Sequence, residues 1–234
     1  MRPVVVRNIP RVPEPVIRRL AASGCATVHE SMGRSGIMKP TLRPIYEGAQ
    51  AAGSAVTVLA QPGDNWMLHI AIEMCHPGDV MVVACMTDNT DGMFGELLAT
   101  SMRAHGVVGL VIDAGCRDVG ALRKLRFPVW SRAISARGTV KDSLGSVNVP
   151  VVCAGTLVNP GDAIVADEDG IAVVPSREAY RVAAAAEERL RKEASDRKRL
   201  AAGELGLDIF AMRQRIAELG LVYVETAADL EDLK

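Results

Sequence analysis

Apolar positions in the first three quarters of the chain switch repeatedly between helical spacing and strand spacing. Residues 13–22 carry apolar side chains at helical spacing and end at Ser23-Gly24, a typical helix C-terminus. Residues 53–60 form a β-branched run closed by a Pro-Gly turn, and residues 67–86 give a helix, a second Pro-Gly turn and another strand. This alternation predicts an α/β protein.

The most apolar run, residues 107–115, predicts a strand buried on both faces, and the charged pair Arg117-Asp118 follows it almost at once. A helix with apolar and small residues on one side is expected before it, over residues 92–106. A short helix, a strand and a group of closely spaced strands are expected after it, over residues 118–127, 128–134 and 147–175. The middle of the chain is therefore predicted to be a β-rich core covered by helices.

The C-terminal quarter has a different composition. Residues 176–202 are dense in Ala, Glu, Arg and Lys and predict a long amphipathic helix, and the helical pattern continues from residue 204 toward the C-terminus. We therefore expect two parts, an α/β domain over residues 1–175 and a helical arm over residues 176–234.

Composition excludes several classes of protein. Apolar residues make up 49% of the 234 residues, charged residues 24%, and the formal net charge is −1, so nothing favours nucleic acid as a partner. The five cysteines are scattered and form no C-x-x-C pair, which indicates reduced thiols and a cytoplasmic protein. No segment approaches the ~18 apolar residues of a membrane helix, and the N-terminus has no signal-peptide core.

Common catalytic motifs are absent from the sequence. It contains no Gly-x-Gly-x-x-Gly, no phosphate loop, no H-E-x-x-H and no G-x-S-x-G, which removes the best support for nucleotide-dependent enzymes and serine hydrolases. The histidines lack zinc-site spacing, so His76 and His105 are interpreted as structural or solvent-facing. His69 could reach a site, but a core position is favoured.

Two segments could carry chemistry. Arg117-Asp118 stands between a buried strand and a helix, where α/β proteins place ligand-binding groups; Arg suits a carboxylate and Asp suits a divalent cation. A local ion pair or a helix cap is the equal alternative. Gly95 and Glu96 open a helix whose free N–H groups attract anions, although Glu96 could simply complement the helix dipole. Cys116 lies beside Arg117 but has no adjoining histidine, so a nucleophilic role is disfavoured.

Long segments of the sequence resemble one enzyme family. They are "GELLATSMRAHGVVGLVIDAGCRD", "FPVWSRAISARGT", "GSVNVPVVCAGTLVNPGDAIVADEDGIAVVP", "RLAAGELGLDIF" and, near the start, "ATVHESMGRSGIM". Together they are similar to the 4-hydroxy-4-methyl-2-oxoglutarate / 4-carboxy-4-hydroxy-2-oxoadipate aldolases, class II pyruvate aldolases that share a fold with the regulator of ribonuclease activity A. The resemblance implies an α-β-β-α sandwich of the swivelling, RraA-like type with a long C-terminal helical arm, assembled as a trimer or a hexamer.

The resemblance also implies site residues. The family motif is an acid, twenty residues and then Arg-Asp, which Glu96, Arg117 and Asp118 match, with Glu96 standing where many relatives have Asp. It implies that Arg117 contacts the substrate, that Asp118 anchors Mg²⁺ or Mn²⁺, and that Glu96 holds a water that takes a proton. The backbone around Gly95, Glu96, Leu97 and Leu98 would hold the pyruvyl carboxylate. An acid from a neighbouring subunit's arm would help, with Glu193 the best match and Glu204 the second.

The implied reaction is metal-dependent cleavage of a 4-hydroxy-2-oxo acid to pyruvate and a second oxo acid, in the breakdown of aromatic acids such as protocatechuate and gallate. Loss of CO₂ from oxaloacetate at the same site is an expected side activity. Two alternatives stay open, an enzyme that is mainly an oxaloacetate decarboxylase and a non-catalytic binding protein like the ribonuclease regulators. The acid at position 96 and the long arm favour the aldolase. Asp113 has no assigned role and is expected to be structural.

Overall fold

The structure is a computed structural model that describes residues 2–229, and the chain divides into two units, Met1–Arg189 and Leu190–Lys234. The strands are β1 (Arg43–Pro44), β2 (Ala51–Ala60), β3 (Val80–Cys85), β4 (Gly92–Phe94), β5 (Gly109–Cys116), β6 (Val129–Ile134), β7 (Ser146–Val147), β8 (Val151–Cys153), β9 (Thr156–Val158), β10 (Ala163–Ala166) and β11 (Ile171–Val174). The helices of the first unit are α1 (Glu14–Ser23), α2 (Cys25–Ser31), α3 (Trp66–Ile72), α4 (Glu96–Ala104), α5 (Val119–Leu125) and a 3-10 turn over Ser176–Glu178. Helix α6 (Ala179–Ala201) runs into the second unit, which also holds α7 (Gly206–Ile209) and α8 (Arg213–Glu218).

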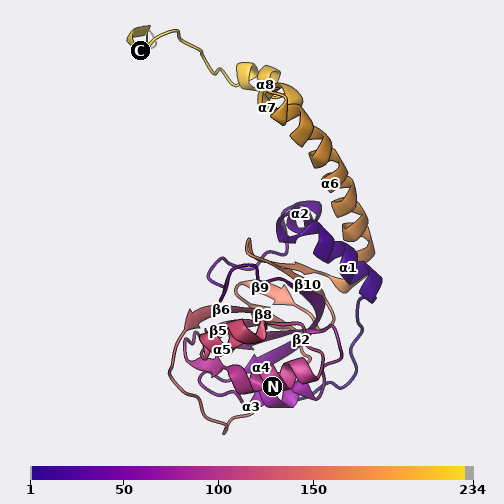
Figure 1. Ribbon diagram of the computed structural model, residues 1–234, viewed down its shortest axis with the longest axis vertical. Helices are drawn as coiled ribbons and strands as arrows, with labels where there is room; N and C mark the ends of the chain where they lie inside the picture. Colours follow the sequence, from indigo (N-terminus) through magenta and orange to yellow (C-terminus); the bar gives the residue numbers. More distant parts are fainter. Residues whose placement is uncertain (1, 230–234) are drawn as a thin grey trace. The chain divides into compact units, whose positions relative to one another are not determined.

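The central strands form one mixed sheet in the order β1-β6-β5-β3-β2-β10-β11. Strands β6, β5, β3 and β2 run parallel, whereas β10 is antiparallel to both β2 and β11. The long strand β2 pairs with β10 through residues 51–54 and with β3 through residues 55–60, so it joins two parts of a curled sheet. The short strands β8 and β9 form a separate hairpin (Figure 1).

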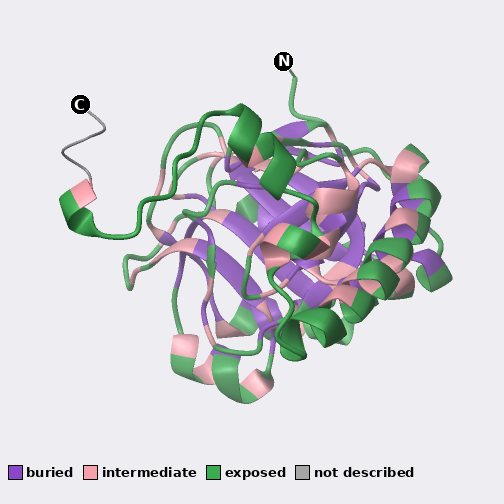
Figure 2. Ribbon diagram, turned by 90° about the horizontal axis from the view of Figure 1, so that it is seen from above, coloured by how far each residue is buried: buried purple, intermediate pink, exposed green. Residues whose placement is uncertain are grey.

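Side chains that alternate along the strands separate three apolar layers. Met81 and Val83 of β3 face helices α3, α4 and α5, while Val80 and Val82 face the β8–β9 hairpin and β10–β11. Residues of β10 alternate in the same way between that middle layer and a third layer under α1, α2 and the start of α6. This order of helices, strands, strands and helices confirms the predicted α-β-β-α sandwich, with buried strands between helices that are exposed on their outer sides (Figure 2).

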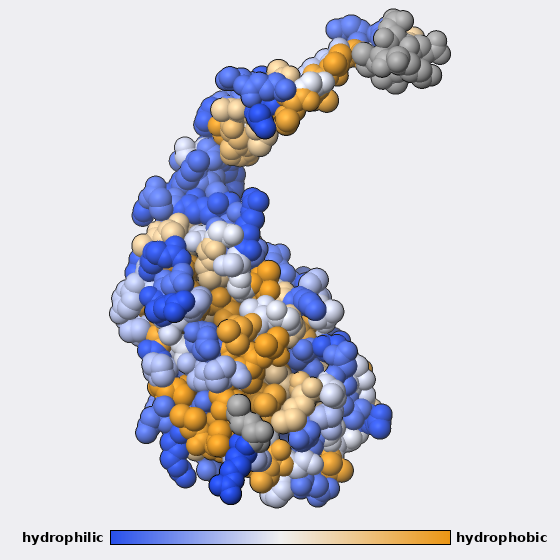
Figure 3. Space-filling model, turned by 180° about the vertical axis from the view of Figure 1, so that it is seen from behind, coloured by the Kyte–Doolittle hydropathy of each residue, from blue (hydrophilic) through white to orange (hydrophobic). Residues whose placement is uncertain are grey.

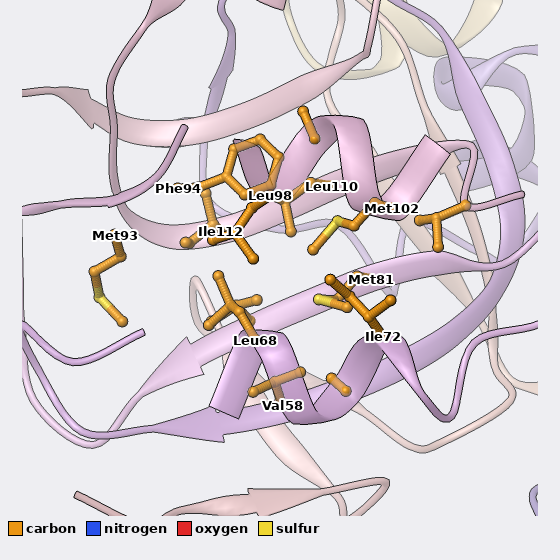
Figure 4. Close-up of a cluster of buried hydrophobic side chains, with 14 of the residues drawn as sticks. Val58, Leu68, Ile72, Met81, Met93, Phe94, Leu98, Met102, Leu110 and Ile112 are labelled. Atoms are coloured by element: carbon orange, nitrogen blue, oxygen red, sulfur yellow. The ribbon is translucent and has the colours of Figure 1, made fainter. Parts of the chain in front are cut away.

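The apolar layer beneath α3 and α4 packs these two helices against the central sheet. Leu68 and Ile72 of α3 and Leu98 and Met102 of α4 point toward Leu110 and Ile112 of β5, whose side chains have no exposed surface (Figure 4). Complete burial of one such side chain contributes about 1.5–3 kcal/mol to folding. The prediction that residues 107–115 form a strand buried on both faces is confirmed, because Val111 between these two residues is equally buried in the opposite layer.

Three Pro-Gly-Asp turns share a structural role. The central glycines Gly63, Gly78 and Gly161 all have positive φ, as expected for this turn. The three aspartates, at positions 64, 79 and 162, are at most 3% exposed, and each carboxylate accepts backbone N–H groups. The interpretation of these tripeptides as turns is confirmed. Their aspartate carboxylates also hold the neighbouring backbone in place through these hydrogen bonds.

Several elements differ from the sequence-based expectations. Helix α2 begins directly after Gly24, where the chain was expected to leave helical structure, because the Asp167 carboxylate accepts the Cys25 N–H at 2.7 Å. The expectation that helix continues from residue 204 is wrong, since Ala211 and Gly220 have positive φ and interrupt it, so that α7 and α8 are both short. No helix within residues 2–229 is long and apolar enough to cross a membrane.

Candidate active site

The end of β5 and the start of α4 are brought together by strand β4. Gly92 and Phe94 of β4 pair with Gly115 and Cys116 of β5, and the Arg117 N–H donates to the Phe94 carbonyl at 2.8 Å. The chain leaves both strands at the same edge, so Gly95-Glu96 and Arg117-Asp118 emerge side by side. Twenty residues of helix, turn and buried strand separate them in sequence, which explains the wide spacing of the motif.

Asp118 is the group that connects the two segments. Its backbone is left-handed, with φ 57° and ψ 31°, and its carbonyl accepts the N–H groups of Ala121 and Leu122 at the start of α5. Its Oδ2 accepts the Glu96 N–H at 3.1 Å and lies 3.8 Å from Nε of Arg117. The carboxylate is 45% exposed, so it is held in place yet open to a ligand.

Gly95 makes this close approach possible. A Cβ added there would lie 2.4 Å from Asp118 Oδ2 and 3.2 Å from Arg117 Cγ. Real Cβ atoms do not approach an oxygen so closely, so any larger residue at position 95 must displace the Asp118 carboxylate. The φ of Gly95 is −155°, which any residue can adopt, so the requirement for glycine comes from space.

Glu96 is the first residue of α4. Its Oε1 accepts a hydrogen bond from the Thr100 hydroxyl at 3.1 Å, one helical turn later. Glu96 and Asp118 line an open hollow of about 650 Å³ together with Val119, Gly120, Ala121, Lys124 and Leu125 of α5. This volume falls within the ~300–1,000 Å³ usual for small-molecule sites.

The two leucines that follow Glu96 contribute backbone rather than side chains. Leu97 is 80% exposed, and Leu98 is 5% exposed and packed in the core beneath α4. Within residues 2–229, no group accepts the N–H of either leucine, as expected in the first turn of a helix. Free donors of this kind, together with the helix dipole, favour negative charge at the start of a helix.

Arg117 lies beside the Asp118 carboxylate, next to the residues that line the hollow. Its side chain is 44% exposed, and a Cβ added to Gly138 would lie 3.6 Å from one guanidinium nitrogen of Arg117. Gly138 therefore lies beside this guanidinium. Because the only acid within 4 Å among the described residues is Asp118, Arg117 keeps donors available for an acidic ligand.

The donor set fits a divalent cation that keeps most of its ligands as water and substrate. No cluster of three or more potential ligands exists within residues 2–229, so a closed protein cage is not formed there. Magnesium commonly binds to one or two carboxylates and retains several waters. Asp118, half exposed and with Oδ1 unused by the described residues, suits that mode, and Glu96 lines the same hollow.

Other residues considered from the sequence fall outside this site. Asp113 is structural, as expected, because its Oδ1 pairs with Arg132 at 2.7 Å and its Oδ2 accepts the Ala154 N–H. Cys116 is fully buried beside the Ser131 hydroxyl, and burial raises the pKa of its thiol, which suits a bystander. The core position favoured for His69 is wrong, since this side chain lies exposed on the outer face of α3.

The two arm acids lie in the second unit. Glu193 is partly buried on α6, and Glu204 follows the end of that helix. Glu204 pairs with Arg199 at 2.6 Å, and this hydrogen bond lowers the pKa of the Glu204 carboxyl. The site described within the first unit therefore contains Gly95, Glu96, Arg117 and Asp118 and no arm acid.

Two residues of the site were missed by sequence reasoning. Thr100 lies four residues after Glu96, and Lys124 lies six residues after Asp118 on the same face of α5 as Ala121. Helical spacing from the two acids could have pointed to both. Neither stood out, because a threonine or a lysine on an exposed helix face is common.

Comparison with known proteins decides the family. Residues 25–173 match the family model described as RraA-like, Aldolase/RraA. The chain belongs to the RraA-like family. The matched region contains every element of the candidate site.

Two relatives and one solved structure illustrate the range of the match. A Halalkalibacterium halodurans protein is 36% identical over 58% of this chain and 64% of its own length, so the chain spans just under two thirds of that relative. A Burkholderia multivorans protein is 31% identical over 65% of this chain and 94% of its own length. Both carry the name "Putative 4-hydroxy-4-methyl-2-oxoglutarate aldolase".

A solved structure from Streptomyces coelicolor, described as an unusual member of the RNase ES inhibitor RraA protein family, superposes with a TM-score of 0.72 at 27% identity. It covers 81% of this chain and 99% of its own.

Proposed function

We propose that this protein is a divalent-metal-dependent class II aldolase. Its substrates are 4-carboxy-4-hydroxy-2-oxoadipate, cleaved to pyruvate and oxaloacetate, and 4-hydroxy-4-methyl-2-oxoglutarate, cleaved to two pyruvates. The observation that carries the proposal is the Asp118 carboxylate, fixed by the Glu96 N–H and flanked by Arg117 at the open end of a buried strand. The names of the aldolase relatives support the same reaction class.

Substrate binding uses the backbone at the start of α4. The N–H groups of Leu97 and Leu98 bind the pyruvyl carboxylate, where the helix dipole favours negative charge. Asp118 holds Mg²⁺ or Mn²⁺, which when bound supplies Lewis acidity toward the 2-oxo acid. The Asp118 side chain is kept in position for this by the Glu96 N–H.

Bond cleavage needs a base and a group that stabilises negative charge. Glu96 accepts the proton of the C4 hydroxyl through a water, and Thr100 orients its carboxylate. The C3–C4 bond breaks, C4 becomes the carbonyl carbon of the departing oxo acid, and the electron pair enters the pyruvate enolate. Arg117 stabilises the enolate oxygen, and a proton returned to C3 completes pyruvate. Oxaloacetate can lose CO₂ through the same enolate, which accounts for the proposed side activity.

The arm is proposed to complete the site of a neighbouring subunit. The second unit has no buried side chain among its described residues and exposes apolar ones, namely Leu200, Leu205, Phe210, Met212, Leu219, Leu221, Val222, Tyr223 and Val224. Apolar side chains also gather on one face of residues 2–189 (Figure 3). Exposed apolar surface of this kind marks association, so we propose a trimer or a hexamer in which Glu193 of one chain approaches Arg117 of the next.

The decisive experiment measures pyruvate release from both hydroxy-oxo acids with added Mg²⁺ or Mn²⁺. Asp118→Asn keeps the shape of the side chain and removes its charge, and Arg117→Ala removes the guanidinium. Each is expected to lower kcat/KM at least ~100-fold, about 2.7 kcal/mol of transition-state stabilisation. Asp169→Asn, at an exposed position outside the site, is the matched control.

Three results would overturn the proposal: no pyruvate from either compound with the wild-type protein, near-normal turnover in Asp118→Asn, or full activity after exhaustive chelation.

Two other functions remain as alternatives. If oxaloacetate is the only compound consumed, the protein is a decarboxylase using the same site. The structural relative described as an RNase ES inhibitor family member motivates the second, a non-catalytic regulator. It predicts that ribonuclease is inhibited equally by wild type and Asp118→Asn, with no turnover of any oxo acid.

A further inference from the structure

We propose that Lys124 determines which C4 substituent the enzyme prefers, by binding the additional carboxylate of 4-carboxy-4-hydroxy-2-oxoadipate. This inference rests on the proposed function and extends it to substrate selectivity. The two candidate substrates are alike around the bond that breaks. They differ at C4, where one carries a methyl group and the other a negatively charged carboxymethyl group.

Lys124 lies on the same wall of the hollow as the metal-binding carboxylate. Asp118, Ala121, Lys124 and Leu125 follow helical spacing along α5 and all line the hollow that Glu96 closes on the α4 side. The neighbouring cation Arg123 is directed elsewhere, since its guanidinium donates to the Ile45 carbonyl at 3.2 Å. Lys124 is therefore the cation that α5 presents to this hollow.

The charge of Lys124 is not neutralised within the described chain. No carboxylate of residues 2–229 lies within 4 Å of its ammonium group, and no hydrogen bond fixes it. The nearby guanidinium of Arg103 is engaged with the Leu125 carbonyl at 3.0 Å. Both acids of the hollow, Glu96 and Asp118, are needed for the reaction, so Lys124 is left to bind an acidic group of the substrate.

Space for such a group exists between the acids and the lysine. Gly120 lies on the hollow between Asp118 and Lys124, and a Cβ added there would meet no heavy atom within 4 Å. A substituent at C4 can therefore extend along α5 without a clash. An ammonium on a flexible four-carbon stem can follow it, which suits recognition of a carboxylate by charge rather than by a fixed geometry.

A simpler role for Lys124 predicts something different. A lysine in the last turn of a helix complements the helix dipole and adds a few tenths of a kcal/mol to stability. That role would change the melting temperature of a variant but would treat both substrates alike. Selectivity between the substrates is therefore the measurement that separates the two roles.

The test compares kcat/KM for both substrates in wild type, Lys124→Met, Lys124→Arg and the control Lys39→Met, which removes an exposed positive charge outside the hollow. Lys124→Met is expected to lower kcat/KM about 10-fold for the carboxymethyl substrate, mainly through KM, and less than about 2-fold for the methyl substrate. Lys124→Arg should keep the wild-type ratio, and the 10-fold effect should shrink as salt is added.

An unchanged substrate ratio in Lys124→Met, with wild type active on both compounds, would overturn the inference and leave the aldolase proposal standing. A similar ratio change in Lys39→Met would overturn it as well, since a general charge effect would then explain the result. Failure of the wild type to release pyruvate from either compound would instead contradict the proposed function itself.

Discussion

Single atoms decide whether the site can form, and Gly95 shows this most directly. The Asp118 carboxylate occupies the space that a Cβ at position 95 would need, at 2.4 Å from its Oδ2. In turn, this carboxylate accepts the Glu96 N–H and stands beside the Arg117 guanidinium. One missing side chain therefore allows three functional groups to meet.

Gly95→Ala is expected to lower kcat/KM at least ~10-fold while leaving the folded structure intact, because displacement of a half-exposed carboxylate costs positioning rather than core packing. Steady-state kinetics and a thermal melt would measure the two effects separately. Gly170→Ala is the matched control, since a Cβ there makes only ordinary contacts, at 3.6 Å from Ile37 and 3.9 Å from Cys25. Wild-type kinetics in Gly95→Ala would contradict this role.

At the scale of elements, the turn between β2 and α3 holds a distant loop. The buried Asp64 carboxylate accepts the N–H groups of Trp66, Asp142 and Ser143, each at 2.7–2.8 Å. Burial acts to raise the pKa of Asp64, but these hydrogen bonds outweigh it and hold the pKa below its ordinary value. The ionised Asp64 carboxylate thus connects the start of α3 to the loop at Asp142 and Ser143.

Because the folded-state pKa of Asp64 is lowered, its contribution to stability should be complete above the unfolded pKa of about 3.9 and should fade as pH falls through the folded value. Asp64→Asn is expected to cost about 1–3 kcal/mol at pH 7. Urea unfolding at several pH values should show the gap between wild type and variant closing below pH ~4. A gap that stays constant down to pH 3 would contradict this, and Asp142→Asn, at an exposed position, should show no such trend.

At the scale of the whole molecule, the first unit contains the three described apolar clusters, whereas residues 190–229 of the second unit include no buried side chain. The sequence-based boundary at 175/176 separates the last strand from the first turn of the C-terminal helices. The boundary by contacts lies at 189/190 because α6 begins by packing Val182 and Ala183 against β10 and β11. The proposal that the arm completes the site of a neighbouring subunit therefore concerns the part of α6 that follows Arg189.

Subunit complementation tests that proposal with full-length chains. Arg117→Ala and Glu193→Ala are each expected to be nearly inactive alone. Mixed oligomers should recover about a quarter of the sites, since a random neighbour pair supplies both intact residues with that frequency. Recovery with Glu204→Ala instead would assign the role to Glu204. A mixture no more active than its parts, from chains shown to have exchanged, would remove the arm acid from the mechanism.

The sequence by itself determined the α/β class and most element positions, because hydrophobic periodicity and local turn chemistry depend on neighbouring residues. The motif of Glu96, Arg117 and Asp118 came instead from the resemblance of the sequence to the aldolase family. The sequence did not reveal helix α2, whose start depends on the Asp167 carboxylate 142 residues away, nor the exposure of His69. Pairing of β4 with β5, the close approach at Gly95 and the hollow that includes Lys124 were decided only by tertiary structure. The physical reason is that these features are contacts between segments far apart in the chain, and such contacts leave no periodic pattern in the sequence of either segment.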